Sequence, residues 1–284
     1  MSLRTPPTLD PTALGVAGAE PGHVYLVGAG PGDPGLLTIR AAALIATADL
    51  VAYDRLSPAE VLDLVPAHAE RICVGKTVDQ PGWHQDDTND LLVAEALGGK
   101  AVVRIKGGDP YVFGRGGEEA IACRNAGVPV EVVSGVSSAV AAPAAAGVPV
   151  THRGIATGVA FITGHEDPTK PDDQIDWEAL ARFHGTLVFL MGVGNAGRIA
   201  GMLIAGGKSP TTPVAVVRWG TTHRQEVLTT DLVSLADDLR RSGMRSPATI
   251  VVGDVVALRS VIASGAADLI ELAPPLDPHL TAIA

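Results

Sequence analysis

The fold is decided by the stretch Val24-Tyr25-Leu26-Val27-Gly28-Ala29-Gly30-Pro31-Gly32-Asp33-Pro34-Gly35. It predicts a short apolar strand that runs into a glycine-rich loop. A run of helix formers follows at residues 36–48. Strand, loop and helix in this order form the repeating unit of α/β proteins, in which ligands bind beyond the carboxyl ends of the strands. The stretch therefore predicts an α/β fold with a ligand loop after its first strand; a tight turn without a ligand is the other interpretation.

The loop suits a ligand without phosphates better than it suits a dinucleotide. The dinucleotide fingerprint needs a third glycine three positions after the second, and that position, counted from Gly30, is Asp33. Pro31 and Pro34 also remove backbone donors, and the Asp33 carboxylate would repel a pyrophosphate. A nicotinamide-dependent oxidoreductase and a non-catalytic nucleotide-binding protein stay open as alternatives at this point.

The strand and helix alternation continues along the chain and predicts two α/β domains. Further apolar strands are expected at residues 50–53, 71–74, 101–105, 130–133, 159–163, 186–191, 213–217, 225–228 and 248–252. The second half has more hairpin-like spacing, so its sheet is expected to be mixed. The predicted division is a disordered tail at 1–22, domains at 23–134 and 135–262, and a loose tail at 263–284.

Composition argues against several classes of function. The chain has 284 residues, of which 46% are hydrophobic and 4% aromatic, and a formal net charge of −10. This acidity argues against a nucleic-acid partner. No apolar run reaches the roughly 18 residues of a membrane helix, and residues 1–22 lack the apolar centre of a signal peptide.

The cysteines and histidines predict a reduced, metal-free protein. Cys73 and Cys123 are the only cysteines and make no disulfide framework, so a cytoplasmic location is expected. No metal site is expected, because the histidines considered are dispersed: His152, His165 and His223.

Charged side chains follow three of the predicted strands. Asp54, Lys76 and Asp109 each stand just beyond a strand, and the carboxyl ends of parallel strands share one edge of a sheet. We therefore expect these side chains on the ligand side of the sheet.

Seven segments, in one order, resemble the motifs of the tetrapyrrole methylase family. Two of them are Val27-Gly28-Ala29-Gly30-Pro31-Gly32-Asp33-Pro34-Gly35-Leu36-Leu37-Thr38 and Val102-Val103-Arg104-Ile105-Lys106-Gly107-Gly108-Asp109-Pro110-Tyr111-Val112-Phe113-Gly114-Arg115-Gly116-Gly117-Glu118-Glu119. The others lie at residues 51–56, 74–76, 134–139, 147–153 and 163–165. The resemblance covers roughly residues 23 to 262. One departure is Ser134, where the family usually has proline.

The resemblance implies two α/β domains with an S-adenosylmethionine site in the interdomain cleft, and a homodimer. Within the family, the segments most resemble enzymes that methylate two ring carbons of uroporphyrinogen III, which gives precorrin-2 for cobalamin or sirohaem synthesis and S-adenosylhomocysteine as by-product. A later methylase of the corrin pathway, with the same fold and cofactor, is the alternative within the family.

The resemblance also implies the site residues. Asp54 matches the family's proposed proton acceptor and Lys76 its proposed proton donor. By its chemistry, the Asp54 carboxylate is equally suited to stabilise the positive charge that develops on the ring. Cofactor contacts are implied for Pro31, Gly107, Gly108, Asp109, Val112, Ser137, Ser138, Met191 and Gly220.

The expected substrate is a polycarboxylate, whereas the protein is itself acidic. Because the net charges repel, the substrate must meet a local basic cluster, and arginine makes forked contacts with carboxylates. The basic candidates are Arg55, Lys106, Arg115, Arg153 and Arg218, together with Lys76.

Overall fold

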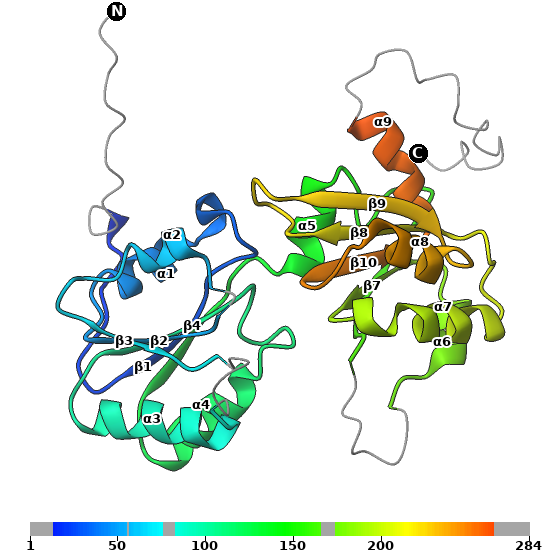
Figure 1. Ribbon diagram of the computed structural model, residues 1–284. Helices are drawn as coiled ribbons and strands as arrows, with labels where there is room; N and C mark the ends of the chain where they lie inside the picture. Colours follow the sequence, from blue (N-terminus) through cyan, green and yellow to red (C-terminus); the bar gives the residue numbers. More distant parts are fainter. Residues whose placement is uncertain (1–13, 56, 76–82, 166–173, 264–284) are drawn as a thin grey trace, which may run out of the picture. The chain divides into compact units, whose positions relative to one another are not determined.

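The computed structural model describes residues 14–55, 57–75, 83–165 and 174–263, and the chain divides into two compact units, Met1–Ser137 and Ser138–Ala284 (Figure 1). Each unit contains one five-stranded sheet covered by helices on both faces. The α/β fold class predicted from the sequence is thus confirmed.

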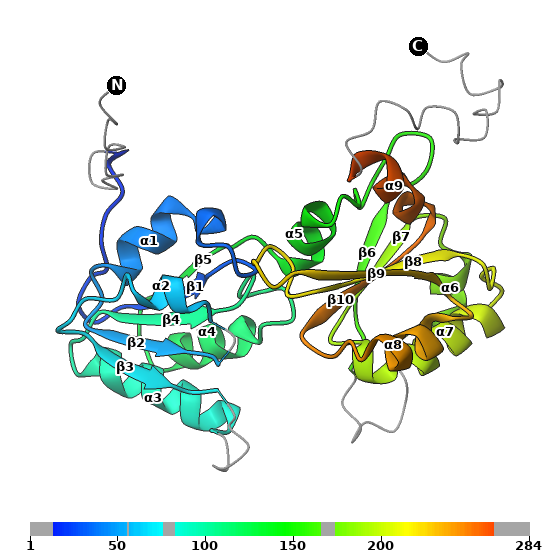
Figure 2. The same ribbon diagram turned by 45° about the horizontal axis from the view of Figure 1, so that its top comes forward.

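The sheet of the first unit is entirely parallel, with the strand order β3-β2-β4-β1-β5. Helices α1 and α2 cover one face of the sheet, and α3 and α4 cover the other (Figures 1 and 2). The strands are β1 (Val24–Gly28), β2 (Leu50–Tyr53), β3 (Glu70–Cys73), β4 (Val102–Lys106) and β5 (Val130–Val133). The helices are the 3-10 turn η2 (Pro34–Leu36), α1 (Ile39–Ile45), α2 (Ala59–Leu62), α3 (Gln85–Leu97) and α4 (Gly116–Asn125).

Strand β4 lies at the centre of this sheet and sends alternate side chains to opposite faces. Val103 and Ile105 belong to the apolar cluster under α1 and α2, whereas Val102 belongs to the cluster under α3 and α4. The same alternation directs Arg104 and Lys106 toward α3 and α4. Both are buried, which is unusual for cations.

The sheet of the second unit is mixed, as the spacing predicted, with the order β6-β7-β10-β8-β9. Only the β6–β7 pair is parallel among its described pairs. Its strands are β6 (Val159–Thr163), β7 (Thr186–Leu190), β8 (Pro213–Arg218), β9 (Glu226–Asp231) and β10 (Ala248–Val252). Its helical segments are α5 (Ser138–Ala145), α6 (Trp177–Arg182), η3 (Val193–Asn195), α7 (Ala196–Ala205), α8 (Leu235–Ser242), η4 (Asp254–Leu258) and α9 (Arg259–Ile262).

The core of the second unit lies mainly between its sheet and helices α6, α7 and α8. Phe189 of β7 is fully buried there and stacks on Trp177 of α6 with ring centroids 6.2 Å apart. On the other face, Ala142 of α5 and Ala146, which follows α5, pack against Val217 of β8. Small side chains let α5 approach the sheet closely at this point.

The first helix is shorter than the sequence predicted. It begins at Ile39 rather than at residue 36, because the Thr38 hydroxyl accepts a hydrogen bond from the backbone N–H of Ala41 at 3.2 Å and caps the helix. The preceding residues form η2 instead, where the Asp33 carboxylate accepts from the N–H of Gly35 at 2.7 Å. None of the helices in the described ranges is long and apolar enough to cross a bilayer.

Candidate active site

Three backbone segments meet beyond the carboxyl ends of β1, β4 and β5. Gly28 pairs with Lys106 in the sheet register, which brings the two glycine loops side by side. Gly30 donates to the carbonyl of Gly108 at 3.2 Å, and Gly108 donates back to Gly30 at 2.7 Å. A Cβ atom on Gly28 would lie 2.5 Å from the backbone nitrogen of Gly135, so only glycine allows this approach.

Asp109 fastens the β4 loop to the segment after β5. Its Oδ1 accepts from the backbone N–H of Tyr111 at 2.8 Å, and its Oδ2 accepts from that of Gly135 at 3.1 Å. Gly107 is exposed, and a Cβ there would touch nothing within 4 Å, so its backbone borders open space. The Gly-Gly-Asp loop is therefore fixed on one side and open on the other.

Two of the remaining cofactor candidates lie in these loops, and two stand where the chain passes from the first unit to the second. Pro31 and Val112 are half-buried in the β1 and β4 loops. Ser137 ends the first unit, and Ser138 opens α5 in the second.

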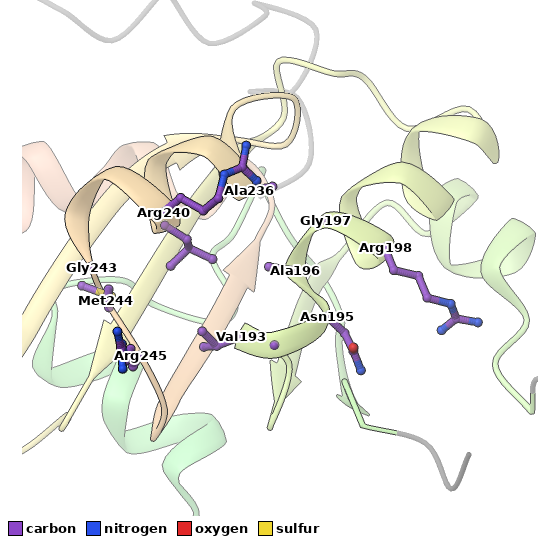
Figure 3. Close-up of a pocket in the computed structure, with 12 residues that line it drawn as sticks. Val193, Asn195, Ala196, Gly197, Arg198, Ala236, Arg240, Gly243, Met244 and Arg245 are labelled. Carbon is purple, nitrogen blue, oxygen red and sulfur yellow. The ribbon is translucent and has the colours of Figure 1, made fainter. Parts of the chain in front are cut away.

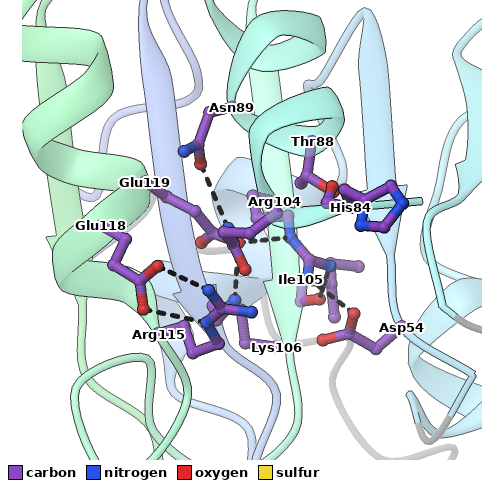
Figure 4. Close-up of polar contacts among 11 residues, drawn as sticks. Asp54, His84, Thr88, Asn89, Arg104, Ile105, Lys106, Arg115, Glu118 and Glu119 are labelled. Carbon is purple, nitrogen blue, oxygen red and sulfur yellow. Dashed lines mark hydrogen bonds and ion pairs between the residues drawn. The ribbon is translucent and has the colours of Figure 1, made fainter. Parts of the chain in front are cut away.

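Asp54 joins a network of buried charges on the α3 and α4 side of the sheet (Figure 4). Its Oδ1 accepts from Nη2 of Arg104 at 2.6 Å. Arg104 also donates from Nε to Oε1 of Glu119 at 3.2 Å, and Lys106 donates from Nζ to the same oxygen at 2.7 Å. Two cations and two carboxylates thus balance each other.

Three members of this network are almost fully withdrawn from water. The side chains of Glu119, Arg104 and Lys106 are 0%, 5% and 4% exposed, whereas that of Asp54 is 35% exposed. Burial lowers the pKa of Lys106, and the positive charge of Arg104 lowers it further, while Glu119 opposes both effects. Ion pairing offsets the large cost of removing these charges from water.

Lys106 was expected to meet a substrate carboxylate, but its ammonium is turned into the interior and bound to Glu119. The alternation of β4 is the physical reason, because position 106 shares the α3 and α4 face with positions 102 and 104. In this structure Lys106 presents no charge to solvent.

The other basic candidates do not form one cluster within the first unit. Arg115 is exposed and makes a forked pair with Glu118 at 2.8 and 2.7 Å. Arg55, which follows β2, is exposed. Lys76, the expected proton donor, lies outside the described residues.

In the second unit, Arg218 at the end of β8 pairs with Glu226 of β9 at 3.1 Å. Arg153 is exposed in the segment between α5 and β6.

Backbone strain coincides with the expected site residues. The non-glycine residues with positive φ among the described ones are Phe113, Arg115, Met191, Trp219 and Thr221. Each is an expected site residue or its direct neighbour, since Phe113 follows Val112 and the last two flank Gly220. A left-handed φ costs about 1–3 kcal/mol, and such residues gather at ligand sites.

Met191 and Gly220 are the cofactor candidates of the second unit. Met191 follows β7 with φ of 58° and 51% of its surface exposed, although a methionine after an apolar strand is usually core. Gly220 packs on α5, because a Cβ there would lie 2.5 Å from that of Ala142.

A cavity of about 640 Å³ in the second unit holds none of the expected site residues (Figure 3). It lies between the start of α7, which holds Arg198 and is preceded by Asn195, and the end of α8, which holds Arg240 and is followed by Arg245. The Arg198 guanidinium lies over the Trp177 ring at 5.4 Å, and Arg240 pairs with Asp237. Within the described residues, no three His, Cys, Asp or Glu side chains are grouped as metal ligands.

Sequence reasoning did not single out Arg104 and Glu119. A signal was present, because Arg104 and Lys106 stand two positions apart in an apolar strand and must share one face. Two buried cations on one face require an anion opposite. The sequence does not identify Glu119 as that anion, because the neighbouring Glu118 is chemically identical.

Comparison with known proteins agrees with this architecture. The model of the family "Tetrapyrrole (Corrin/Porphyrin) Methylases" matches residues 23–236. The S-adenosyl-L-methionine-dependent uroporphyrinogen III methyltransferase of Methanosarcina barkeri is 51% identical over 241 residues, which make up 85% of this chain and 94% of that protein. Siroheme synthase 1 of Yersinia enterocolitica is 51% identical over 243 residues, and the matched part spans 50% of that protein.

Solved structures give the same result. Uroporphyrin-III C-methyl transferase of Thermus thermophilus, complexed with S-adenyl homocysteine, superposes with a TM-score of 0.71 at 42% identity, over 83% of this chain and 99% of that chain. A cobalt precorrin-4 methyltransferase superposes with a TM-score of 0.74 at 28% identity, over 83% and 96% of the two chains. These matches confirm the resemblance in the motifs: the chain belongs to the tetrapyrrole (corrin/porphyrin) methylase family.

Proposed function

We propose that this protein is an S-adenosylmethionine-dependent uroporphyrinogen-III C-methyltransferase, which methylates two ring carbons and yields precorrin-2. The 51% identity to the Methanosarcina barkeri methyltransferase, over nearly all of that protein, carries this proposal. Membership of a methylase family does not support the two alternatives, a nicotinamide-dependent oxidoreductase and a non-catalytic nucleotide-binding protein.

The loops of the first unit fit S-adenosylmethionine, which has a nucleoside and a sulfonium but no phosphate. The β1 loop offers few backbone donors because of Pro31 and Pro34, and Asp33 adds a negative charge. The exposed backbone of Gly107 leaves room for a ligand beside the fixed Asp109 loop. We propose Pro31, Gly107, Gly108, Asp109, Val112, Ser137, Ser138, Met191 and Gly220 as the cofactor contacts.

The strained backbone supports this assignment independently of sequence similarity. Val112, Met191 and Gly220 each coincide with, or adjoin, a residue with positive φ. Because the rest of the fold must compensate for this strain, it is typical of positions shaped for a ligand.

When bound, S-adenosylmethionine supplies an electrophilic methyl group, and the protein's task is to hold the reacting ring carbon in line with it. Asp54 is the acid closest to solvent in the charged network. Its Oδ1 is held by Arg104. Within the described residues this leaves Oδ2 to stabilise the positive charge on the ring or to accept the proton that the ring carbon loses. Lys76 is proposed as the proton donor.

Substrate carboxylates are proposed to meet the exposed Arg55 and Arg153. Arg115 and Arg218 can join them if the substrate competes with Glu118 and Glu226 for their guanidinium groups. Lys106 is the least suited of the basic candidates, because it is buried against Glu119.

The deciding experiment is mass spectrometry of the product formed from uroporphyrinogen III and S-adenosylmethionine. A gain of two methyl groups is expected, and an unchanged ring contradicts the proposal. Cobalt precorrin-4 is tested in parallel, because the similarity to its methyltransferase favours it as the second candidate. Calorimetry with S-adenosylhomocysteine and with NADH separates the methylase from an oxidoreductase.

The pathway, the cellular location and the oligomeric state are part of the same proposal. We propose that the product supplies cobalamin or sirohaem synthesis, that the protein is cytoplasmic, and that it is a homodimer. Its two free cysteines, Cys73 and Cys123, suit a reducing compartment. Light scattering after size exclusion tests the dimer.

A further inference from the structure

The Arg104 guanidinium bridges two carboxylates that come from different elements. Nη2 donates to Asp54 beyond β2 at 2.6 Å, and Nε donates to Glu119 of α4 at 3.2 Å. Nη1 donates to the carbonyl of Ile105 at 2.9 Å. Because a guanidinium is planar and its donors point in fixed directions, three partners at once set its orientation.

Glu119 is the fixed end of this bridge. It is fully buried, and its Oε1 accepts from Arg104, Lys106 and the amide of Gln85, the last at 3.4 Å. Its Oε2 has no hydrogen-bond partner within the described part of the chain. A buried carboxylate of this kind adds little net stability over an apolar side chain of similar volume, so its value lies in where it holds its two cations.

Asp54 is the solvent-exposed end of the bridge. Its side chain is 35% exposed, whereas that of Arg104 is 5% exposed. The buried arginine is therefore not positioned to contact a macrocycle, but it fixes one oxygen of a carboxylate that is accessible from solvent. The position of α4 thus fixes Glu119, Glu119 fixes the Arg104 guanidinium, and Arg104 fixes one oxygen of Asp54.

We propose that Arg104 is a positioning residue, which, itself held by Glu119, fixes the Asp54 carboxylate for methyl transfer. This inference rests on the proposed function, in which Asp54 acts on the ring. Lysine at position 104 keeps the charge, but its three N–H donors all start from one nitrogen. They therefore cannot span the three separate positions from which Nε, Nη1 and Nη2 of Arg104 reach Glu119, the Ile105 carbonyl and Asp54.

The test is a double-mutant cycle with Asp54→Asn, Arg104→Lys and the double variant. Arg104→Lys is expected to lower kcat on the order of a hundredfold, since small misplacements of a reacting group have effects of this size. KM and the affinity for S-adenosylhomocysteine, measured by calorimetry, are expected to stay near wild type. In the Asp54→Asn background, Arg104→Lys is expected to lower kcat by no more than about twofold. This is the deviation from additivity usually found for two substitutions that do not interact.

Arg40→Lys is the matched control. Arg40 makes a forked pair with Glu131 in the same unit, at 2.9 and 2.7 Å, from α1 on the opposite face of the sheet. Its replacement by lysine likewise removes an ion pair made by two guanidinium nitrogens, and kcat is expected to stay at the wild-type value. Melting temperatures of all variants exclude loss of kcat through unfolding.

Full additivity in the cycle, or wild-type kcat in Arg104→Lys, would overturn the positioning role. If the wild-type protein does not methylate the ring, the proposed function fails separately. A crystal structure of Arg104→Lys then decides the inference: Asp54 in its original rotamer would contradict it, and a displaced carboxylate would support it.

Discussion

The backbone of Gly135 passes so close to the carbonyl oxygen of Gly108 that a Cβ atom on Gly135 would lie 2.2 Å from that oxygen. This approach joins the segment after β5 to the Gly-Gly-Asp loop after β4. Asp109 closes the same junction from the other side, through its hydrogen bond to the N–H of Gly135.

Gly135→Ala is expected to destabilise the protein by at least about 1–3 kcal/mol, the usual cost of overpacking, because backbone rather than a flexible side chain must move. S-adenosylhomocysteine affinity is expected to fall as well, since the shift of the backbone displaces the N–H of residue 135 that Asp109 accepts from. Gly117→Ala is the control: a Cβ there touches nothing within 4 Å on the helix α4, so stability should change by less than about 1 kcal/mol. Urea unfolding measures the stability of both variants, and equal stabilities of Gly135→Ala and Gly117→Ala would refute the close packing at Gly135.

Glu119→Gln is expected to lower the free energy of unfolding by about 3–5 kcal/mol, because Lys106 stays buried without an anion and Arg104 keeps only Asp54. Glu118→Gln, one residue away, removes an exposed pair with Arg115 and should cost about 0–1 kcal/mol. Denaturant titration of the two variants compares them. Similar losses would mean that the buried network contributes no more than the surface pair.

Asp109→Ala is expected to weaken S-adenosylhomocysteine binding more than Asp54→Asn does. Asp109 holds the backbone N–H groups of Tyr111 and Gly135, so its loss loosens the loop that borders the cofactor. Asp54→Asn keeps the shape of its side chain and should lower turnover while leaving cofactor affinity nearly unchanged. Isothermal calorimetry and single-turnover rates separate the two effects; equal affinities would contradict the assignment.

The two thiols are expected to differ strongly in reactivity. Burial raises the pKa of Cys123 to about 11 from its ordinary 9.0, and the nearby charge of Glu119 adds to the effect, whereas Cys73 is exposed. At about pH 8, iodoacetamide should therefore label one cysteine in the native protein and both after denaturation, as counted by mass spectrometry. Rapid labelling of both thiols in the native state would contradict the burial of Cys123.

The raised pKa of Cys123 also determines whether stability rises or falls with pH. Between 9.0 and about 11, the unfolded thiol has released its proton while the folded one keeps it. The folded state binds more protons in this window, so the contribution of Cys123 is fully present below pH 9.0 and is lost as pH rises toward 11. Cys123→Ala should remove this part of the pH dependence.

Raising the salt concentration is expected to increase the KM for uroporphyrinogen III and to leave cofactor affinity nearly unchanged. The substrate is a polycarboxylate, and exposed charges are screened over about 8 Å at physiological salt. Arg55→Gln and Arg153→Gln should raise KM at low salt and reduce its salt dependence, whereas Arg40→Gln, on a residue already paired with Glu131, should not. A KM that stays flat across salt would argue against a basic substrate site.

The sequence by itself determined the fold class and the position of nearly every described strand. Strands β2, β5, β6 and β10 lie where the apolar runs predicted, since a run of mostly apolar residues bounded by glycine or charge is a local property of the sequence. The glycine loop after β1 was equally evident, because its spacing is visible in adjacent residues. The motifs, in their order along the chain, also indicated the protein family.

Only the tertiary structure decided which charges meet. Glu119 lies 13 positions beyond Lys106, and Asp54 lies 50 positions before Arg104, so no local pattern links them. Their contact requires β2 to lie next to β4 in the sheet and α4 to cover the face to which β4 turns its even-numbered side chains. Sequence spacing fixes which residues share a face of one element, but strand order and helix packing determine what lies opposite that face, and this is why Lys106 binds Glu119 rather than facing solvent.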